Sequence, residues 1–385
     1  MKTDSILFTQ CLQNDFVMPV GRYAPLPNRL HIGHAEAVRL MGDNPAEGPV
    51  ARMMEWAYRQ DASQLEIIHL LDRHDPEAID QATHLRQFGE HCLEGSPGAE
   101  LAFRIPSGCI NQAHLVFSPN LNDFQDTNLE RLMYRRNGTK TRAGIMGVWT
   151  EAKVYFLAYE LATRYPQMEL AVCPALCASS SRGQHFAAID QLRRILGVRI
   201  CDSIGEFMEF LGGDADSFPL NTPQSGLPHI TLQSGYTLQD EDMGLLRYLY
   251  RNCREVRGRV LDGGFSGNVV LGTASIDLHG HEEAAHVVKI GPRNAMGQER
   301  QAFEHIEEVL GNSAPRISDF ADFGERGAIK YRYASVGHGP VSTFQKQYMA
   351  GMPLDKIRQV LSTVFEEQLG DRKSTRLNSS HESPS

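Results

Sequence analysis

The stretch Leu65–Pro76 reads LEIIHLLDRHDP, and it decides the class of fold. The almost wholly apolar run Leu65–Leu71, which is predicted to be a strand, is followed at once by charged and imidazole side chains. A short continuous apolar run is typical of a strand that is buried on both faces of a parallel sheet. The polar residues after it would lie at the carboxyl end of the strand, where such sheets place their sites.

The same alternation of short apolar runs and amphipathic stretches continues on both sides of this segment. Further strands are predicted at Ser5–Leu12, Leu115–Phe117, Ala143–Val148, Glu169–Cys173 and Val198–Ile200. Helices are predicted at Ala35–Met41, Val50–Arg59, Glu151–Arg164 and Gln184–Leu196. Strands that alternate with helices indicate an α/β domain with a doubly wound parallel sheet, here over residues 1–212.

Length and composition exclude several classes of protein. The chain has 385 residues, which is long enough for two domains. Its hydrophobic fraction of 41% is close to that of globular proteins, so wholesale disorder is excluded. No apolar run reaches the ~18 residues of a membrane helix, which predicts no membrane partner. The formal net charge of −9 argues against a general binder of phosphate backbones, so no nucleic-acid partner is expected.

The seven cysteines are dispersed, and none forms a CxxC pair. An odd, scattered set of this kind argues against a disulfide framework and against a zinc knuckle. A reducing, cytoplasmic location is the expectation that follows.

The composition changes after residue 212. Residues 213–236 are rich in Gly, Pro, Ser and Asp and are predicted to be a linker. Residues 237–370 predict an antiparallel-rich α+β domain, unlike the first half. Its predicted elements are a helix at Leu238–Arg254, two short runs in Val260–Leu271, strands at His286–Ile290 and Ala328–Val336, and helices at Gln298–Leu310 and Leu354–Leu369.

The last stretch, Asp371–Ser385, is polar and shows no periodicity. Its run DRKSTRLNSSH is similar to the translated reading frame of a sequencing adapter, so it is set apart from the fold. The alternative is an ordinary disordered terminus.

Several ordered motifs in the first domain carry a family resemblance. They are LQNDF at Leu12–Phe16, DRHDP at Asp72–Pro76, EHCLEGSPGAEL at Glu90–Leu101, NDFQDTNLERLM at Asn122–Met133, GVWTEAKV at Gly147–Val154 and CASSSRGQHFAAIDQL at Cys177–Leu192. Together they resemble the isochorismatase/nicotinamidase-like cysteine hydrolase superfamily over about residues 5–212. The resemblance implies a three-layer Rossmann-like domain that hydrolyses small ligands through a cysteine nucleophile, an aspartate and a lysine.

All three catalytic positions depart from this pattern. Cys11 stands where the family has its aspartate, and Lys153 stands where it has its cysteine. The family's lysine would fall near Ser118 or Pro119, which are neither bases nor cations. One interpretation is an exchanged pair, in which Lys153 lowers the pKa of Cys11 and leaves a reactive thiolate. The other is a pocket that has lost this chemistry and binds a ligand or supports the fold.

The resemblance also implies a metal site at Asp72, His74 and His91. The family's middle histidine would fall near Asp80 or His84. One carboxylate with two or three imidazoles suits Zn, Fe or Mn and leaves a position for water or substrate. The alternative is a set of histidines that are only hydrogen-bonded.

The second domain contains LDGGFSGNV at Leu261–Val269, in which Gly264, Ser266 and Gly267 separate two apolar runs. Glycines at such a turn let backbone N–H groups approach phosphates. Lys289 follows in a strand pattern, and Glu299 follows on a helix, with Glu304 as the other candidate for its partner. These residues resemble the small lobe of protein kinases and aminoglycoside phosphotransferases, which implies ATP with Mg. The alternative is a small antiparallel sheet packed on a helix, with no nucleotide.

Two hypotheses for the whole chain follow. In one, a hydrolase-fold domain with an altered triad is fused to an ATP-dependent phosphotransferase-like domain. In the other, the first domain is a non-catalytic module for sensing small molecules or for homo-oligomer formation, and it controls the kinase-like part. No H-x-D, D-x-x-x-x-N or D-F-G pattern follows Lys289 in the right order, so the kinase-like part is expected to be truncated.

Overall fold

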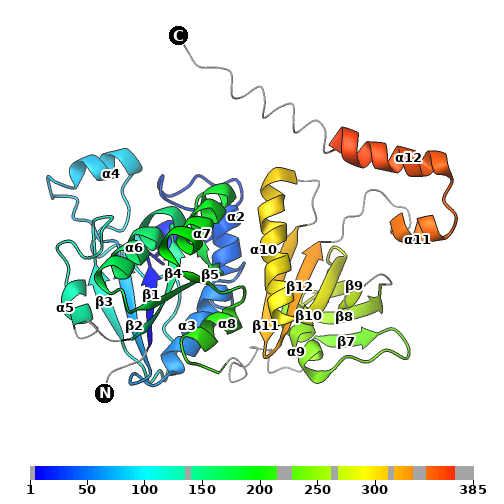
Figure 1. The fold of residues 1–385 in the computed structure, drawn as a ribbon, viewed down its shortest axis with the longest axis horizontal. Coiled ribbons are helices and arrows are strands. Elements are labelled where there is room, and N and C mark those ends of the chain that lie inside the picture. The colour runs from blue at the N-terminus through cyan, green and yellow to red at the C-terminus, as the bar shows by residue number, and fades with distance from the viewer. Residues whose placement is uncertain are drawn as a thin grey trace, which may run out of the picture.

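Two six-stranded sheets organise the part of the chain that the computed structural model describes, which is residues 5–134, 140–214, 228–261, 268–310, 316–332 and 344–368. Helices cover both faces of the first sheet, and the second sheet lies beside them (Figure 1). The predicted loop residues Gly264, Ser266 and Gly267 lie outside the described residues, as does the predicted tail.

The first sheet is parallel throughout and has the strand order β3-β2-β1-β4-β5-β6. Its strands are β1 (Ser5–Gln10), β2 (Leu65–Leu71), β3 (Ala113–Phe117), β4 (Arg142–Val148), β5 (Glu169–Ala178) and β6 (Arg199–Ile200). The order reverses its direction between β1 and β4, which is the doubly wound arrangement. The prediction of a parallel α/β sheet in the first half of the chain is therefore confirmed.

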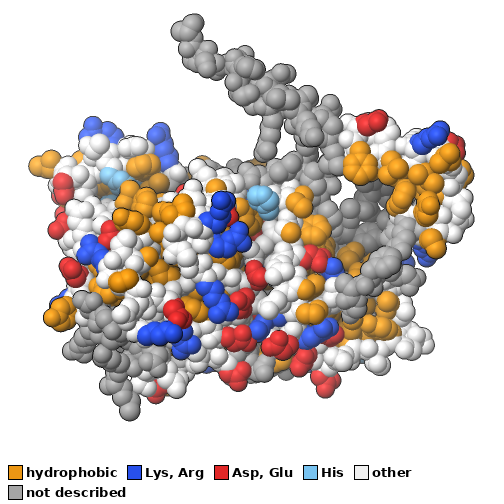
Figure 2. Space-filling view, in the orientation of Figure 1, with side chains coloured by type: hydrophobic (Ala, Val, Ile, Leu, Met, Phe, Trp, Pro, Cys, Tyr) orange, Lys and Arg blue, Asp and Glu red, His pale blue; other side chains and the backbone are white. Residues whose placement is uncertain are grey.

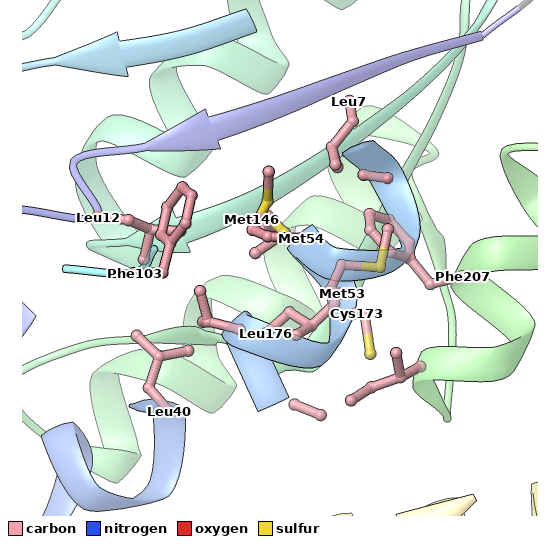
Figure 3. Packing of buried hydrophobic residues seen from close by; sticks show 14 of the residues in the cluster. Leu7, Leu12, Leu40, Met53, Met54, Phe103, Met146, Cys173, Leu176 and Phe207 are labelled. Carbon is pink, nitrogen blue, oxygen red and sulfur yellow. The ribbon is translucent and has the colours of Figure 1, made fainter. Parts of the chain in front are cut away.

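Two layers of helices bury this sheet. The helices α2 (His34–Met41), α3 (Pro49–Arg59) and α8 (Ile204–Phe210) cover one face, and α5 (Leu129–Met133), α6 (Tyr155–Arg164) and α7 (Arg182–Leu196) cover the other. In β1, Leu7 faces the first layer, while Ile6 and Phe8 face the second, as the two-residue period of a strand requires. Figure 3 shows the first layer, where Met53 lies beside Phe207 and Met54 lies beside Met146.

Strand β5 is longer than predicted. The predicted strand ends at Cys173, and the next residue, Pro174, cannot donate a ladder hydrogen bond. In the structure the strand continues to Ala178, and its pairing with β4 shifts register between Ile145 and Gly147. An irregular ladder at this point tolerates the missing N–H.

The second sheet has the order β11-β12-β10-β9-β8-β7 and is antiparallel, except that β7 pairs with β8 in parallel. Its strands are β7 (His229–Leu232), β8 (Cys253–Val260), β9 (Val269–Asp277), β10 (His286–Pro292), β11 (Ile317–Phe323) and β12 (Arg326–Arg332). Helix α9 (Asp240–Leu249) covers one face, and α10 (Arg293–Leu310) covers the other.

The predicted helix at Leu238–Arg254 is too long. Helix α9 ends at Leu249, and the chain enters β8 at Cys253. From Val256 to Arg259 buried and exposed positions alternate, and this period of two is typical of a strand rather than of a continuing helix. Strand β7 lies inside the range that was predicted as linker, and β11 was not predicted at all.

The helices α11 (Phe344–Met349) and α12 (Leu354–Ser362) follow the second sheet. Their surface carries apolar side chains, which Figure 2 shows as an orange area over these two helices. Among the described residues, no helix combines the length and the apolar character that a bilayer crossing requires.

Candidate functional site

The candidate residues of the first domain meet at the carboxyl ends of neighbouring strands. Cys11 follows β1, and Asp72 follows β2. Lys153 lies in the π-helical turn η3 (Thr150–Val154), just after β4. Gly147 allows β4 to pass close to β1, because a Cβ on it would lie 2.1 Å from the carbonyl oxygen of Gln10. Parallel strands thus bring together residues that are far apart in the sequence.

Three of the motifs behind the resemblance contact one another. Gln13 holds the backbone of Asp72 at both ends: its Nε2 donates to the Asp72 carbonyl (2.8 Å), and its Oε1 accepts from the Asp72 N–H (2.7 Å). The Asp15 carboxylate accepts from the N–H of Cys92 at 2.7 Å, and the N–H of His74 donates to the Cys92 carbonyl at 3.0 Å. The LQNDF, DRHDP and EHCLEG segments therefore form one support for the site.

Lys153 is buried between two carboxylates. Its Nζ lies 3.1 Å from Asp72 Oδ1 and 3.4 Å from Asp123 Oδ1, and it also donates to the Ser118 carbonyl at 3.3 Å. Burial alone would lower the pKa of Lys153, but the carboxylates, chiefly Asp72, hold it well above its usual range. The side chain is therefore an ammonium ion, and it is not available as a base or a nucleophile.

The two carboxylates respond differently to the same ammonium. Burial raises the pKa of Asp72, but Lys153 and His74 outweigh burial and lower this pKa to about 2. At Asp123, burial dominates over the attraction of Lys153, and the pKa is raised. Gln10 Nε2 donates to Asp123 Oδ2 at 2.6 Å and fixes this second carboxyl. No role was predicted for Asp123, although it lies in a motif that carried the resemblance.

Cys11 is fully buried at the end of β1, with φ at 48°. Burial raises the pKa of its thiol, and the carboxyls of Asp72 and Asp123 act in the same direction. The ammonium of Lys153 opposes them but does not outweigh burial. The thiol is therefore protonated at neutral pH in this arrangement.

The histidines beside Asp72 converge on one point. Each of His74, His84 and His91 offers a ring nitrogen within 4.8 Å of the others. The Nε2 atoms of His74 and His91 lie 3.4 and 3.9 Å from Asp72 Oδ2. Of the two positions that the resemblance allowed for the middle histidine, His84 is the one that reaches this cluster.

The outer nitrogens of two of these rings are already engaged. His74 Nδ1 lies 3.0 Å from Gln81 Oε1, and His91 Nδ1 lies 2.6 Å from the Gly89 carbonyl. Because both partners are acceptors, each Nδ1 carries a proton, and the neutral form of each ring has its lone pair on Nε2. His74 Nε2 is buried and has no hydrogen-bond partner. These residues fit a divalent metal, with Asp72 Oδ2 as the carboxylate ligand.

In the second domain, Lys289 on β10 pairs with Glu299 on α10, with 2.5 Å between Nζ and Oε2. Tyr331 at the end of β12 donates to Glu299 Oε1 at 3.0 Å. Glu304, the other candidate partner of Lys289, is paired with Arg300 and Arg182 instead. The flanks of the predicted glycine loop belong to the antiparallel strands β8 and β9.

Comparisons with known proteins found a match for each half of the chain. A family model described as "Ternary complex associated domain 9" matches residues 253–382. That match covers most of the second domain and includes residues 371–382 of the predicted tail. It is not a kinase model, so the kinase-like expectation rests on the residues themselves. No curated protein matches the chain.

Solved structures similar to the first half include three amidases. The nicotinamidase of Bacillus subtilis is 16% identical, covers 52% of this chain and 99% of its own, and has a TM-score of 0.40. The pyrazinamidase/nicotinamidase of Streptococcus mutans is 20% identical, and the match covers 51% of this chain and 99% of that protein, with a TM-score of 0.39. The pyrazinamidase of Pyrococcus horikoshii in complex with zinc is 20% identical, and the match covers 51% of this chain and 98% of that protein, with a TM-score of 0.37.

Proposed function

We propose that the second domain is the small lobe of an ATP-dependent, kinase-like module, and that the first domain is a metal-binding module that controls it. The ion pair between Lys289 and Glu299 is the observation that carries the proposal. In kinases, a strand lysine that contacts the nucleotide phosphates is held by a carboxylate of the following helix. The strand order, in which β12 returns beside β10 after α10, supports the same assignment.

The nucleotide site is proposed to lie along β8, β9 and β10. Lys289 would hold the phosphates of ATP, Glu299 would orient Lys289, and Gly264, Ser266 and Gly267 would cover the phosphates with backbone N–H groups. Bound Mg would neutralise phosphate charge there. The Lys289 and Glu299 side chains are each about one quarter exposed, at 25% and 24%, so phosphate oxygens can reach the pair.

Replacing Lys289 with methionine tests this site. The affinity for Mg·ATP should fall by about 10–100-fold, since a hydrogen bond to a charged group contributes about 1.5–3 kcal/mol. Titration calorimetry with a non-hydrolysable ATP analogue measures the change. Lys356→Met on the exposed face of α12 is the matched control and should bind as the parent does. Equal affinities in the two variants, or no binding by the parent, would contradict the proposal.

In the first domain, we propose that Asp72, His74, His84 and His91 hold a divalent metal such as Zn, Fe or Mn. The metal would act as a Lewis acid toward an oxygen or nitrogen of a small amide, amine or enol-ether ligand. Lys153 keeps one oxygen of Asp72 engaged and leaves the other directed at the histidines. In this proposal the domain binds its ligand without covalent chemistry, because burial keeps the Cys11 thiol protonated and raises its pKa.

The second candidate function is a hydrolase with the exchanged pair, which the nearness of the Lys153 charge to Cys11 favours. Alkylation with iodoacetamide near neutral pH separates the two functions. We expect the exposed Cys109 to be modified and the buried Cys11 to be spared, as judged by peptide mass spectrometry. Rapid alkylation of Cys11 that is lost in Lys153→Met would instead establish the exchanged pair.

A further inference from the structure

Helix α10, which carries Glu299, lies between the two domains (Figure 1). One side of the helix packs on β10 and β12, where Met296 and Phe303 contact Ile329 and Tyr331. The other side packs on α7 of the first domain. The rings of Phe186 on α7 and His305 on α10 meet edge to face, with 5.0 Å between their centroids. The helix therefore packs against the sheet of the second domain on one side and against the first domain on the other.

A buried ion network joins α10 to the first domain. Glu304, which is 3% exposed, accepts from Arg182 Nη1 at 3.2 Å and from Arg300 Nη1 at 2.9 Å. Arg182 also reaches Glu36 on α2 through its Nε, at 2.8 Å. Arginines outweigh burial at Glu304 and lower its pKa to about 2, so it is a carboxylate. Moving α10 away from the first domain would leave the buried Glu304 carboxylate without Arg182, and an uncompensated buried charge is costly.

A second set of contacts with the first domain holds the N-terminal half of α10. Gln298 and Gln301 donate to the two carboxylate oxygens of Asp202, at 3.0 and 2.8 Å. Gly297 lies against the backbone of the same residue, since a Cβ on it would come within 2.4 Å of the Asp202 carbonyl oxygen. The first domain thus contacts α10 on both sides of Glu299 in the sequence.

The same part of α7 reaches back to the candidate site. Thr150 opens the turn that carries Lys153, and its hydroxyl donates to the Ala178 carbonyl at 3.0 Å. Since that proton is used, the 2.8 Å contact with His185 Nδ1 is a hydrogen bond that His185 donates. His185 lies one helical turn after Arg182 on α7. Packed contacts therefore run without a break from the Lys153 turn to Glu304.

We propose that the first domain positions α10 through the Arg182–Glu304 ion pair and so keeps Glu299 within reach of Lys289. Glu299 and Glu304 lie on one helix, about 7.5 Å apart along its axis at 1.5 Å per residue, so a shift at one is carried to the other. Glu304 and Arg182 are positioning residues in this arrangement. The regulation of nucleotide binding that follows rests on the proposed function of the second domain.

Glu304→Gln in the two-domain chain of 385 residues tests the inference, because it removes the charge and keeps the shape. The dissociation constant for Mg with a non-hydrolysable ATP analogue should rise about tenfold, within the usual range of coupling between sites. Acylation of the Lys289 amine, followed by peptide mass spectrometry, should become about fivefold faster as the pair with Glu299 loosens. The second readout needs no nucleotide, so it separates this inference from the proposed nucleotide site.

Glu47→Gln is the matched control. Glu47 pairs with Arg251 across the same domain interface at 3.3 Å but does not touch α10. It should change neither readout, whereas a general loosening of the interface would change both variants alike. If Glu304→Gln fails to fold, Gln298→Ala with Gln301→Ala loosens the helix without leaving a buried charge, and Lys289 labelling should still rise. Unchanged labelling in a folded variant that loosens α10 overturns the inference.

Discussion

Replacing Lys153 with methionine should lower the free energy of unfolding by about 3–5 kcal/mol, because it leaves two buried carboxyls without their cation. Asp72 and Asp123 are only 5% and 2% exposed, so water does not replace the lost partner. Methionine preserves most of the side-chain volume, which keeps cavity effects small. Urea unfolding followed by circular dichroism measures the change.

The control for this experiment is Lys140→Met. Lys140 pairs with Glu169 at 3.0 Å, but the two side chains are 79% and 49% exposed. An exposed pair contributes about 0–1 kcal/mol, so the control should stay near the parent. If Lys153→Met were no more destabilising than Lys140→Met, Lys153 would not be the cation that compensates the two carboxyls.

The same substitution should change the pH dependence of stability. The pKa of Asp72 is depressed from 3.8 to about 2 in the folded protein, so its stabilising contribution is present above 3.8. That contribution is lost as the pH falls through about 2. In Lys153→Met the pKa of Asp72 should rise toward or above its unfolded value. Acidification across this pH range should then lower the free energy of unfolding less than in the parent, or should even raise it. Unfolding curves measured at several pH values in this range test this.

Zinc should bind the first domain, and His91→Ala should lower its affinity by at least about 100-fold, beyond the ~10–100-fold typical of changes in the partners of metal ligands. His91 is 1% exposed and aims its Nε2 at the space shared with His74 and Asp72. Competition with a chromophoric chelator measures the affinity without any assay of activity. At a free zinc concentration of about 100 times the dissociation constant, the parent should gain about 2.7 kcal/mol of stability.

Two further variants sharpen the zinc experiment. Gln81→Ala removes the acceptor that orients His74 and should weaken zinc binding by about 10–100-fold. His114→Ala on the exposed edge strand β3 should bind zinc as the parent does, since His114 lies apart from the cluster. Equal affinities for His91→Ala and His114→Ala would show that the histidine cluster is not a metal site.

Local pattern was enough to predict the architecture of the first half. The apolar run at Leu65–Leu71 and its counterparts identified the buried strands, because a strand covered on both faces needs apolar side chains on both. The strand at Leu65–Leu71 has the bounds that were predicted, whereas the ends of β5 and α9 differ. In both cases pairing with a neighbouring strand sets the observed end: β5 pairs with β4 as far as Ala178, and the chain after α9 pairs with β9 from Cys253 onward.

Sequence alone was enough to predict which residue types stand at the strand ends, and the family resemblance predicted that Lys153 stands where the family has its cysteine. Tertiary structure decided what those residues do. It brought Asp123 to Lys153 and chose His84 over Asp80 for the histidine cluster. It also chose Glu299 over Glu304 for the pair with Lys289. The physical reason is that the ionisation of Cys11, Lys153 and Glu304 depends on burial and on charges from distant segments, which spacing along the chain does not encode.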